Sequence, residues 1–373
     1  MSYRINRLLA LLIAVTFVSS AVAQEKEVAE KTPTPKVQVA ILLDNSGSIS
    51  GLINQARSEL WKIVNEFATA KQDGVAPDLE VALYHYGSPP AKQLVPLTDD
   101  LDKVSEAMFG IGIGGGSEYC GQAIDIASKN LKWSKNDRDL KLIFIAGNEP
   151  FSQGPVDFRK ACKAAIEKGI IVNTIHCGSS LPQDWKEGSL LADGSSFNID
   201  HNKSVAHIPA PQDKEIIELG TRLNKTYVAY GLEGAAQAKN QIAQDNNSSG
   251  AGIASAQNRA VTKANRLYRN SSWDLCDAFQ DEKVDLAKID PAQLPENMRK
   301  MTPEERKSYV EGKQAERKEI QDKINKLNSD RNAFVTKKRK ELAGEADAET
   351  LDVALIKTIH EQATKKNFSF ENK

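Results

Sequence analysis

The sequence predicts an α/β protein: a doubly wound, mainly parallel β-sheet with helices on both faces, followed by an α-helical C-terminal region. Strand-like apolar runs recur along residues 37–200, and amphipathic helical patterns lie between them. Continuously apolar strands that alternate with helices are typical of a parallel sheet covered on both faces. The dense charge of residues 281–340 is typical of a helical C-terminal region that is either solvated or part of a coiled coil.

The expected strands cover residues 37–43, 79–86, 140–146, 170–176 and 197–200. Apolar residues three and four apart predict a helix over residues 52–67, and a second helix is expected over 155–168, closed by Gly169. Ligands of such sheets bind where the carboxyl ends of the strands meet. A functional site is therefore expected among the loops after Leu43, Tyr86, Ala146 and His176.

Residues 1–23 have the pattern of a secretory signal peptide. Arg4 and Arg7 precede an apolar run of about a dozen residues, and Ala21-Val22-Ala23 has the small-x-small pattern of a cleavage site. The run is too short for a permanent membrane anchor, and the alternative is an uncleaved signal that tethers the chain to the membrane. We therefore expect an exported protein, periplasmic or extracellular, with no transmembrane segment after signal cleavage. The polar residues 24–36 are expected to form a linker.

The charge balance excludes one class of partner. Lys and Arg number 49 against 50 Asp and Glu, which gives a formal net charge of -1. Such a balanced chain has no overall positive field that would attract nucleic acid. We expect no nucleic-acid partner.

The first strand leads into the strongest motif of the chain, Asp44-Asn45-Ser46-Gly47-Ser48. This loop carries one carboxylate and two hydroxyl groups within five residues and runs directly into the expected helix over 52–67. Oxygen ligands of this kind suit a hard divalent cation such as Mg²⁺, which keeps some of its bound water. Alternatively, Asp44 and the serines cap the helix without binding an ion.

With its strand and helix, the segment VQVAILLDNSGSISG resembles the von Willebrand factor A-like (vWA) domain and its metal-ion-dependent adhesion site. The resemblance covers residues 37–205 and implies a Rossmann-like fold. It also implies a divalent cation, Mg²⁺ or Ca²⁺, held by Asp44, Ser46 and Ser48, with a carboxylate from a protein partner completing the coordination shell. The strings D-x-S-G-S, E-Y-C-G and A-G-N-E-P-F resemble a bacterial subgroup of these domains whose function is not established.

Two other loops depart from the family pattern. The second loop has Ser117 and Glu118 where a threonine is usual, and the third has Gly147 where an aspartate is expected, with Glu149 two residues later. If Glu118 and Glu149 both point inward, the site holds three carboxylates with Asp44, which favours Ca²⁺. If neither reaches the site, it binds metal weakly or not at all.

The four cysteines allow a disulfide in an exported protein. Cys120 and Cys177 are expected at the same edge of the sheet, so a bridge between them is one interpretation and buried free thiols are the other. His176 is adjacent to Cys177, but neighbouring residues of a strand point to opposite faces. We therefore expect no Cys–His catalytic pair and no enzyme activity.

Three regions are expected after the linker: a vWA-like domain over 37–231, a helical extension packed on it over 232–280, and a charged helical region over 281–373. Residues 246–250 are expected to form a loop within the extension. Thr302, Pro303 and Glu305 form a capping-box pattern that predicts a helix reaching Ala343.

Along that helix a thin apolar stripe falls near a seven-residue repeat, formed by Val310, Ile320, Ile324, Leu327 and Phe334. Charged residues, including Arg317, occupy the positions between them. The helix is therefore either a coiled coil that supports a homo-oligomer, or a solvated helix that lies against the protein or pairs with residues 351–363. The tail is expected to fray, or to form a short edge strand or docking contact through Phe368 and Phe370.

The expected function is that of an exported, non-catalytic binding protein whose vWA-like domain mediates metal-dependent protein–protein interaction or adhesion. The alternative is an envelope scaffold with a degenerate metal site, which works through its C-terminal helices. The charged helical stretch 281–340 is the one place where an anionic partner could bind; its basic cluster at 337–340 either contacts an anionic surface or is simply solvated.

Overall fold

Strand β1 (Lys36–Leu43) lies in the middle of the sheet and is buried along almost its whole length. The computed structural model describes residues 34–47, 61–199, 208–343 and 351–370, all within one compact unit, Thr34–Lys373. Side chains of β1 alternate between two apolar clusters, with Ile41 and Leu43 in one and Ala40 and Leu42 in the other. This alternation explains why the strand is continuously apolar: each face of the sheet is covered.

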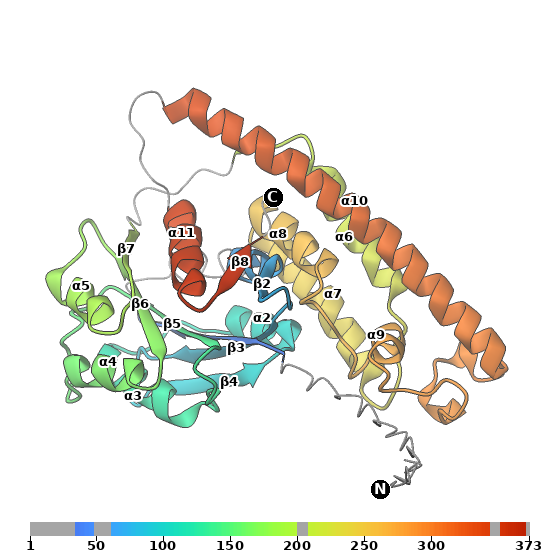
Figure 1. Cartoon of the computed structure of the whole chain (residues 1–373), viewed down its shortest axis with the longest axis horizontal. Helices are drawn as coiled ribbons and strands as arrows, with labels where there is room; N and C mark the ends of the chain where they lie inside the picture. The colour runs from blue at the N-terminus through green and yellow to red at the C-terminus, as the bar shows by residue number, and fades with distance from the viewer. Residues whose placement is uncertain (1–33, 48–60, 200–207, 344–350, 371–373) are drawn as a thin grey trace, which may run out of the picture. The chain divides into compact units, whose positions relative to one another are not determined.

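The main sheet has the strand order β4-β3-β1-β5-β6-β7 (Figure 1). The other strands are β3 (Asp78–His85), β4 (Lys92–Thr98), β5 (Leu140–Gly147), β6 (Ile170–Cys177) and β7 (Ser196–Ile199). All neighbours run parallel except β3 and β4, which are antiparallel. The predicted doubly wound, mainly parallel fold is confirmed, and the edge strand β4 is an addition to it.

Helices cover both faces of the sheet. One apolar cluster contains side chains of residues 61–67, of α2 (Leu101–Phe109) and of α11 (Leu351–Thr364). The other contains side chains of α3 (Cys120–Asn130), α4 (Phe158–Ile166) and α5 (Gln183–Leu190). The helix predicted over 155–168 is thus α4, and Gly169 follows it with a left-handed φ of 70°. Of the helix predicted over 52–67, residues 61–67 are helical and the rest lie outside the described residues.

The region between the sheet and the long C-terminal helix is built of short helices. These are α6 (Asp213–Leu223), η2 (Asn224–Thr226), α7 (Gly234–Gly250), α8 (Ile253–Ala264), α9 (Leu275–Gln280), η3 (Pro291–Gln293) and η4 (Glu296–Met298). The prediction of a loop at residues 246–250 is wrong, because α7 continues to Gly250. Tertiary hydrogen bonds hold this polar helix: Gln244 accepts from Ser105 at 2.9 Å, and Gln241 donates to Tyr268 at 3.1 Å.

A buried ionic cluster joins α2, α7 and α8. Arg259 on α8 pairs with Asp102 at 2.6 Å and with Asp245 at 3.0 Å, and Lys263 pairs with Asp245 at 2.6 Å. Both cationic side chains are almost completely buried. Because buried charges are tolerated only when paired, the cluster fixes α7 and α8 on the helix α2 that covers the sheet.

Helix α10 (Pro303–Ala343) begins and ends where the sequence predicts. The capping box is present: Glu305 accepts from the backbone N–H of Thr302 at 2.8 Å, and Thr302 Oγ1 accepts from that of Glu305 at 3.2 Å. The apolar stripe is used within the chain. Ile320 and Ile324 pack with residues of α6 and α8, and Val310 packs with Leu275 and Met298.

Arg317 explains why a charge stands in this stripe. Its guanidinium is buried and donates to Asp274 and Asp277 at 2.8 Å each. It also donates to the backbone oxygen of Thr226 at 2.8 Å. The two carboxylates keep the pKa of Arg317 above its ordinary value although burial acts against the charged form. The sequence favoured a solvated position for Arg317. In the structure, its buried ion pairs instead hold α10 against the rest of the chain.

The C-terminal segment completes the sheet domain. Leu355 and Ile359 of α11 lie in the apolar cluster on one face of the sheet, and Gln362 exchanges two hydrogen bonds with Asn173 of β6, at 3.0 and 2.7 Å. Strand β8 (Phe368–Phe370) pairs antiparallel with β2 (Ala70–Gln72), which confirms the edge-strand interpretation of the tail. Within the described ranges, no helix is long and apolar enough to cross a membrane.

Candidate metal site at the carboxyl edge of the sheet

Three loops meet where β3, β1 and β5 end. They begin at Asp44 after β1, at Tyr86 after β3 and at Asn148 after β5, and these strands are direct neighbours in the sheet. Parallel neighbours end at the same edge, so the topology brings the three loops together. The sequence predicts that these loops gather at one edge of the sheet, and they do.

Asp44 lies at the centre of this edge and is fully buried. Its backbone N–H donates to the oxygen of Ala146 at 3.0 Å, and its Oδ1 accepts from the backbone N–H of Ser46 at 2.7 Å. Its other oxygen, Oδ2, is buried and has no hydrogen-bond partner among the described residues. Burial is the main cause that raises the pKa of Asp44 from 3.8 to about 6.

The other candidate ligands lie around Asp44 to different degrees. Ser46 and Glu118 are buried, whereas Ser117 and Glu149 are partly exposed. The negative charges of Glu118 and Glu149 each contribute to raising the pKa of Asp44. Both carboxylates therefore add negative electrostatic potential at Asp44. Ser48 lies outside the described residues.

The residues present fit a divalent cation that also uses hydroxyl oxygens or water. A buried carboxylate oxygen without a partner is costly unless a positive group compensates it. No group of three His, Cys, Asp or Glu side chains is arranged to hold a metal in the part of the chain that the structure describes. A cation bound to the carboxylate of Asp44 therefore needs further oxygen ligands that are not carboxylates, and the hydroxyl of Ser46 can supply one.

Asn45, to which the sequence assigned no role, holds the loops together. Its Nδ2 donates to the oxygen of Gly112 at 2.9 Å, and its Oδ1 accepts from the backbone N–H of Gly87 at 2.9 Å. Its backbone oxygen accepts from Gly114 at 2.8 Å. The glycine-rich segment 111–116 is thus fastened to the loop that carries Asp44, and a Cβ on Gly115 would lie 1.7 Å from the oxygen of Gly87.

Cys120 and Cys177 do not form the disulfide that was one interpretation of the sequence. All four cysteines are buried free thiols. Cys120 belongs to the apolar cluster on one face of the sheet and Cys177 to the cluster on the other, so their side chains diverge. The same alternation separates His176 from Cys177: His176 lies against Trp185, which packs with the cluster of Cys120.

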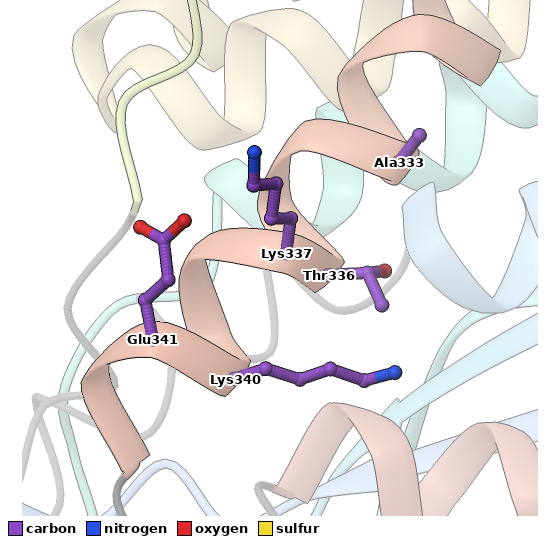
Figure 2. Close-up of a pocket in the computed structure, with 5 residues that line it drawn as sticks. All are labelled: Ala333, Thr336, Lys337, Lys340 and Glu341. Atoms are coloured by element: carbon purple, nitrogen blue, oxygen red, sulfur yellow. The ribbon is translucent and has the colours of Figure 1, made fainter.

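A hollow lies on α10, outside these loops. Figure 2 shows the side chains that line it, all from the last turns of this helix: Ala333, Thr336, Lys337, Lys340 and Glu341. Two residues of the basic cluster 337–340, Lys337 and Lys340, line it. A third residue of the cluster, Lys338, forms an ion pair with Glu341 at 2.6 Å. One solvated helix face of this kind holds no buried polar group that would define a ligand.

Comparison with known proteins assigns part of the chain to a family. The model of the von Willebrand factor type A domain matches residues 38–206. Among curated proteins no sequence matches the chain. Similar solved structures include the VWA domain of SpRpn10, with 19% identity over 44% of this chain and 88% of that one, at a TM-score of 0.36.

Two other solved structures are similar to the same degree. The conserved hypothetical protein BatB from Bacteroides thetaiotaomicron shares 18% identity over 44% of this chain and 90% of that one, at a TM-score of 0.36. Proximal thread matrix protein 1 from the mussel byssus, with a zinc-occupied MIDAS motif, shares 14% identity over 46% of this chain and 43% of its own, at 0.37. The family match, together with the observed sheet, identifies residues 38–206 of this chain as a von Willebrand factor type A domain.

Proposed function

We propose that this protein is a non-catalytic binding protein whose vWA domain mediates divalent-metal-dependent interaction with another protein. The observation that carries the proposal is the buried Asp44 Oδ2, which lacks a hydrogen-bond partner among the described residues. Asp44, Ser46 and Ser48 hold the cation, with Ser117, Glu118 and Glu149 as further candidates in the loops around them.

The roles of the residues follow from their places at the edge of the sheet. Asp44 supplies the negative charge, and its Oδ1, fixed by the N–H of Ser46, orients Oδ2. Glu118 and Glu149 add negative potential without forming a closed carboxylate cage in the described part of the chain. A bound Mg²⁺ or Ca²⁺ supplies an open coordination position for a carboxylate of the partner protein.

The cellular setting is part of the proposal. The signal-like residues 1–23 support export to the periplasm or the cell exterior, and the balanced charge of the chain supports a protein partner over nucleic acid. Mass spectrometry of the protein recovered from its native cells tests export, because cleavage is expected to leave Gln24 as the first residue. A recovered chain that retains residues 1–23 contradicts it.

Calorimetric titration of the full chain with Mn²⁺, Mg²⁺ or Ca²⁺ tests the metal site. We expect saturable binding that Asp44→Ala abolishes. Asp99→Ala is the matched control, because Asp99 is an exposed acid whose charge acts on Asp78 at the opposite edge of the sheet. Absence of binding at millimolar cation, or binding unchanged in Asp44→Ala, overturns the proposal.

The partner is tested with the same variants. Immobilised wild-type protein is expected to retain a partner in Mg²⁺ and to release it in chelator, whereas immobilised Asp44→Ala retains none. Retention that is indifferent to the chelator contradicts a metal-bridged contact.

The alternative, a scaffold that assembles through its C-terminal helices, has less support. Val310, Ile320 and Ile324, which would form the seam of a coiled coil, pack inside the chain. Light scattering of the full chain separates the two functions: a monomer at micromolar concentration contradicts the scaffold, and a stable oligomer favours it.

A further inference from the structure

Tyr86 lies at the centre of the candidate metal site, although the family pattern gives it no role. It follows β3 directly and is fully buried on the side of the sheet that α3 and α4 cover. Its hydroxyl donates to the oxygen of Ala146 at 2.7 Å, the same oxygen that accepts from the backbone N–H of Asp44 at 3.0 Å. One carbonyl thus fixes the phenol beside Asp44.

The phenol of Tyr86 occupies the space that a side chain at position 147 would need. A Cβ built on Gly147 would lie 2.4 Å from the hydroxyl oxygen of Tyr86, and 3.3 Å from both Cβ and Oδ2 of Asp44. Contacts below 3.0 Å are essentially never seen for a real Cβ, and the phenol cannot move without losing its hydrogen bond. A side chain at position 147 would therefore enter the space between Tyr86 and Asp44, and Tyr86 excludes it.

The chemistry of this space favours a positive group. The proton of the Tyr86 hydroxyl is used by Ala146, so its oxygen can only accept from other groups, and the weak donor Cys120 Sγ lies 3.8 Å away. Burial keeps the phenol protonated, since it raises the pKa of Tyr86 well above 10. Two acceptors, the phenol oxygen and Asp44 Oδ2, thus lie 2.4 and 3.3 Å from one point, the position of a Cβ built on Gly147, and Oδ2 is buried without a hydrogen-bond partner among the described residues.

The geometry points to Tyr86 as the residue that stands in for the missing third-loop carboxylate: a neutral, fixed oxygen that accepts from the cation's bound water beside Asp44. This inference rests on the proposed function, because it concerns the same cation. Tyr86 and Gly147 form a matched pair, since the phenol is accommodated only where residue 147 has no side chain.

Calorimetric titration of the full chain with Mn²⁺ tests the role of the hydroxyl. We expect Tyr86→Phe to weaken Mn²⁺ binding about tenfold or more, as loss of a group that supports metal ligands generally does. Tyr84→Phe is the matched control, because Tyr84 lies two residues earlier on β3 and its buried hydroxyl donates to Gln93 at 2.8 Å, outside the site. We expect its Mn²⁺ affinity to equal that of the wild type.

The outcomes separate the two proposals. If Asp44→Ala abolishes Mn²⁺ binding while Tyr86→Phe binds as the wild type does, the inference is overturned and the metal site stands. If the wild type binds no Mn²⁺, the metal site itself fails. A fall in affinity shared equally by Tyr84→Phe overturns the inference too, because it assigns the effect to general loosening of β3.

Thermal unfolding in chelator tests the matched pair without any metal. We expect Gly147→Ala to lower the melting temperature of the wild type by several degrees, and to lower that of Tyr86→Phe by less, because the clashing oxygen is gone. Equal losses in the two backgrounds overturn the steric part of the inference.

Discussion

Replacing Asp44 by asparagine is expected to make the metal-free protein more stable at neutral pH. The folded protein raises the pKa of Asp44 from 3.8 to about 6, mainly through burial. A carboxyl group with a raised pKa stabilises the folded state while it is protonated, and this contribution is lost as pH rises through the folded value. The charged Asp44 is therefore a cost that the site bears when no cation is bound.

The magnitude follows from the size of the shift. Each unit of pKa corresponds to about 1.4 kcal/mol, so the full cost of the ionised Asp44 is about 3 kcal/mol at pH 7.5. At pH 4.5 the folded protein still holds the proton, and the same relation gives about 1 kcal/mol. The asparagine variant carries no such charge and keeps the Oδ1 acceptor for the N–H of Ser46.

Urea denaturation in chelator, at pH 4.5 and pH 7.5, measures this difference. We expect Asp44→Asn to exceed the wild type in free energy of unfolding at pH 7.5, and the gap between them to shrink by about 2 kcal/mol at pH 4.5. Asp99→Asn, which removes one carboxylate at an exposed position outside the site, serves as the control. A variant no more stable than the wild type at pH 7.5, or a gap that does not change with pH, refutes the reasoning.

Four further results are expected. Affinity for Mn²⁺ should rise between pH 5 and pH 7 in calorimetric titrations, because the cation requires Asp44 without its proton; affinity that falls over this range contradicts the assignment. Deleting residues 351–373 should lower the free energy of unfolding by more than about 5 kcal/mol in urea denaturation, since it removes several apolar side chains from one core cluster. Arg317→Ala should cost about 3 kcal/mol, because it leaves two buried carboxylates unpaired, whereas the exposed Lys318→Ala should cost less than about 1 kcal/mol; equal losses would show that the anchor is unimportant. The four cysteines should be unreactive toward a thiol reagent in the native state and all react after denaturation; fewer than four would reveal a disulfide.

Local patterns predicted the parallel part of the sheet. Its central strands β1, β5 and β6 are buried on both faces, so each is a largely apolar run that can be recognised without knowledge of its neighbours. The edge strand β4 shows the limit of this signal. Only Val95 of its residues is buried, it contains Pro96 and it has only one pairing neighbour, so its sequence lacks the apolar continuity of the others.

Polar helices were predicted less well because tertiary contacts decide them. Residues 246–250 favour a loop by composition, yet α7 continues through them, since buried hydrogen bonds to α2 and to Tyr268 hold the helix. Arg317 misled in the same way. On a helix its charge suggests a solvated position, whereas two aspartates from α9 and its N-terminal cap bury it.

At the candidate site, the sequence determined which loops meet and which residue supplies the first carboxylate. Asp44 directly follows a strand that is buried on two faces, and such strands are recognised from the local pattern. The sequence could not show that the hydroxyl of Tyr86 occupies the space in front of Gly147, because the two residues lie 61 positions apart and meet only across β1, the strand between β3 and β5.

The sequence by itself therefore determined which segments form the parallel strands, the long helix with its cap, and the position of Asp44, because periodicity and capping depend on residues a few positions apart. Only the tertiary structure decided what surrounds Asp44, why Cys120 and Cys177 diverge, and that α11 and β8 belong to the sheet domain. These depend on which face of the sheet each side chain enters and on contacts between distant segments. Local patterns do not encode such contacts, because the segments acquire them only by packing on the same sheet.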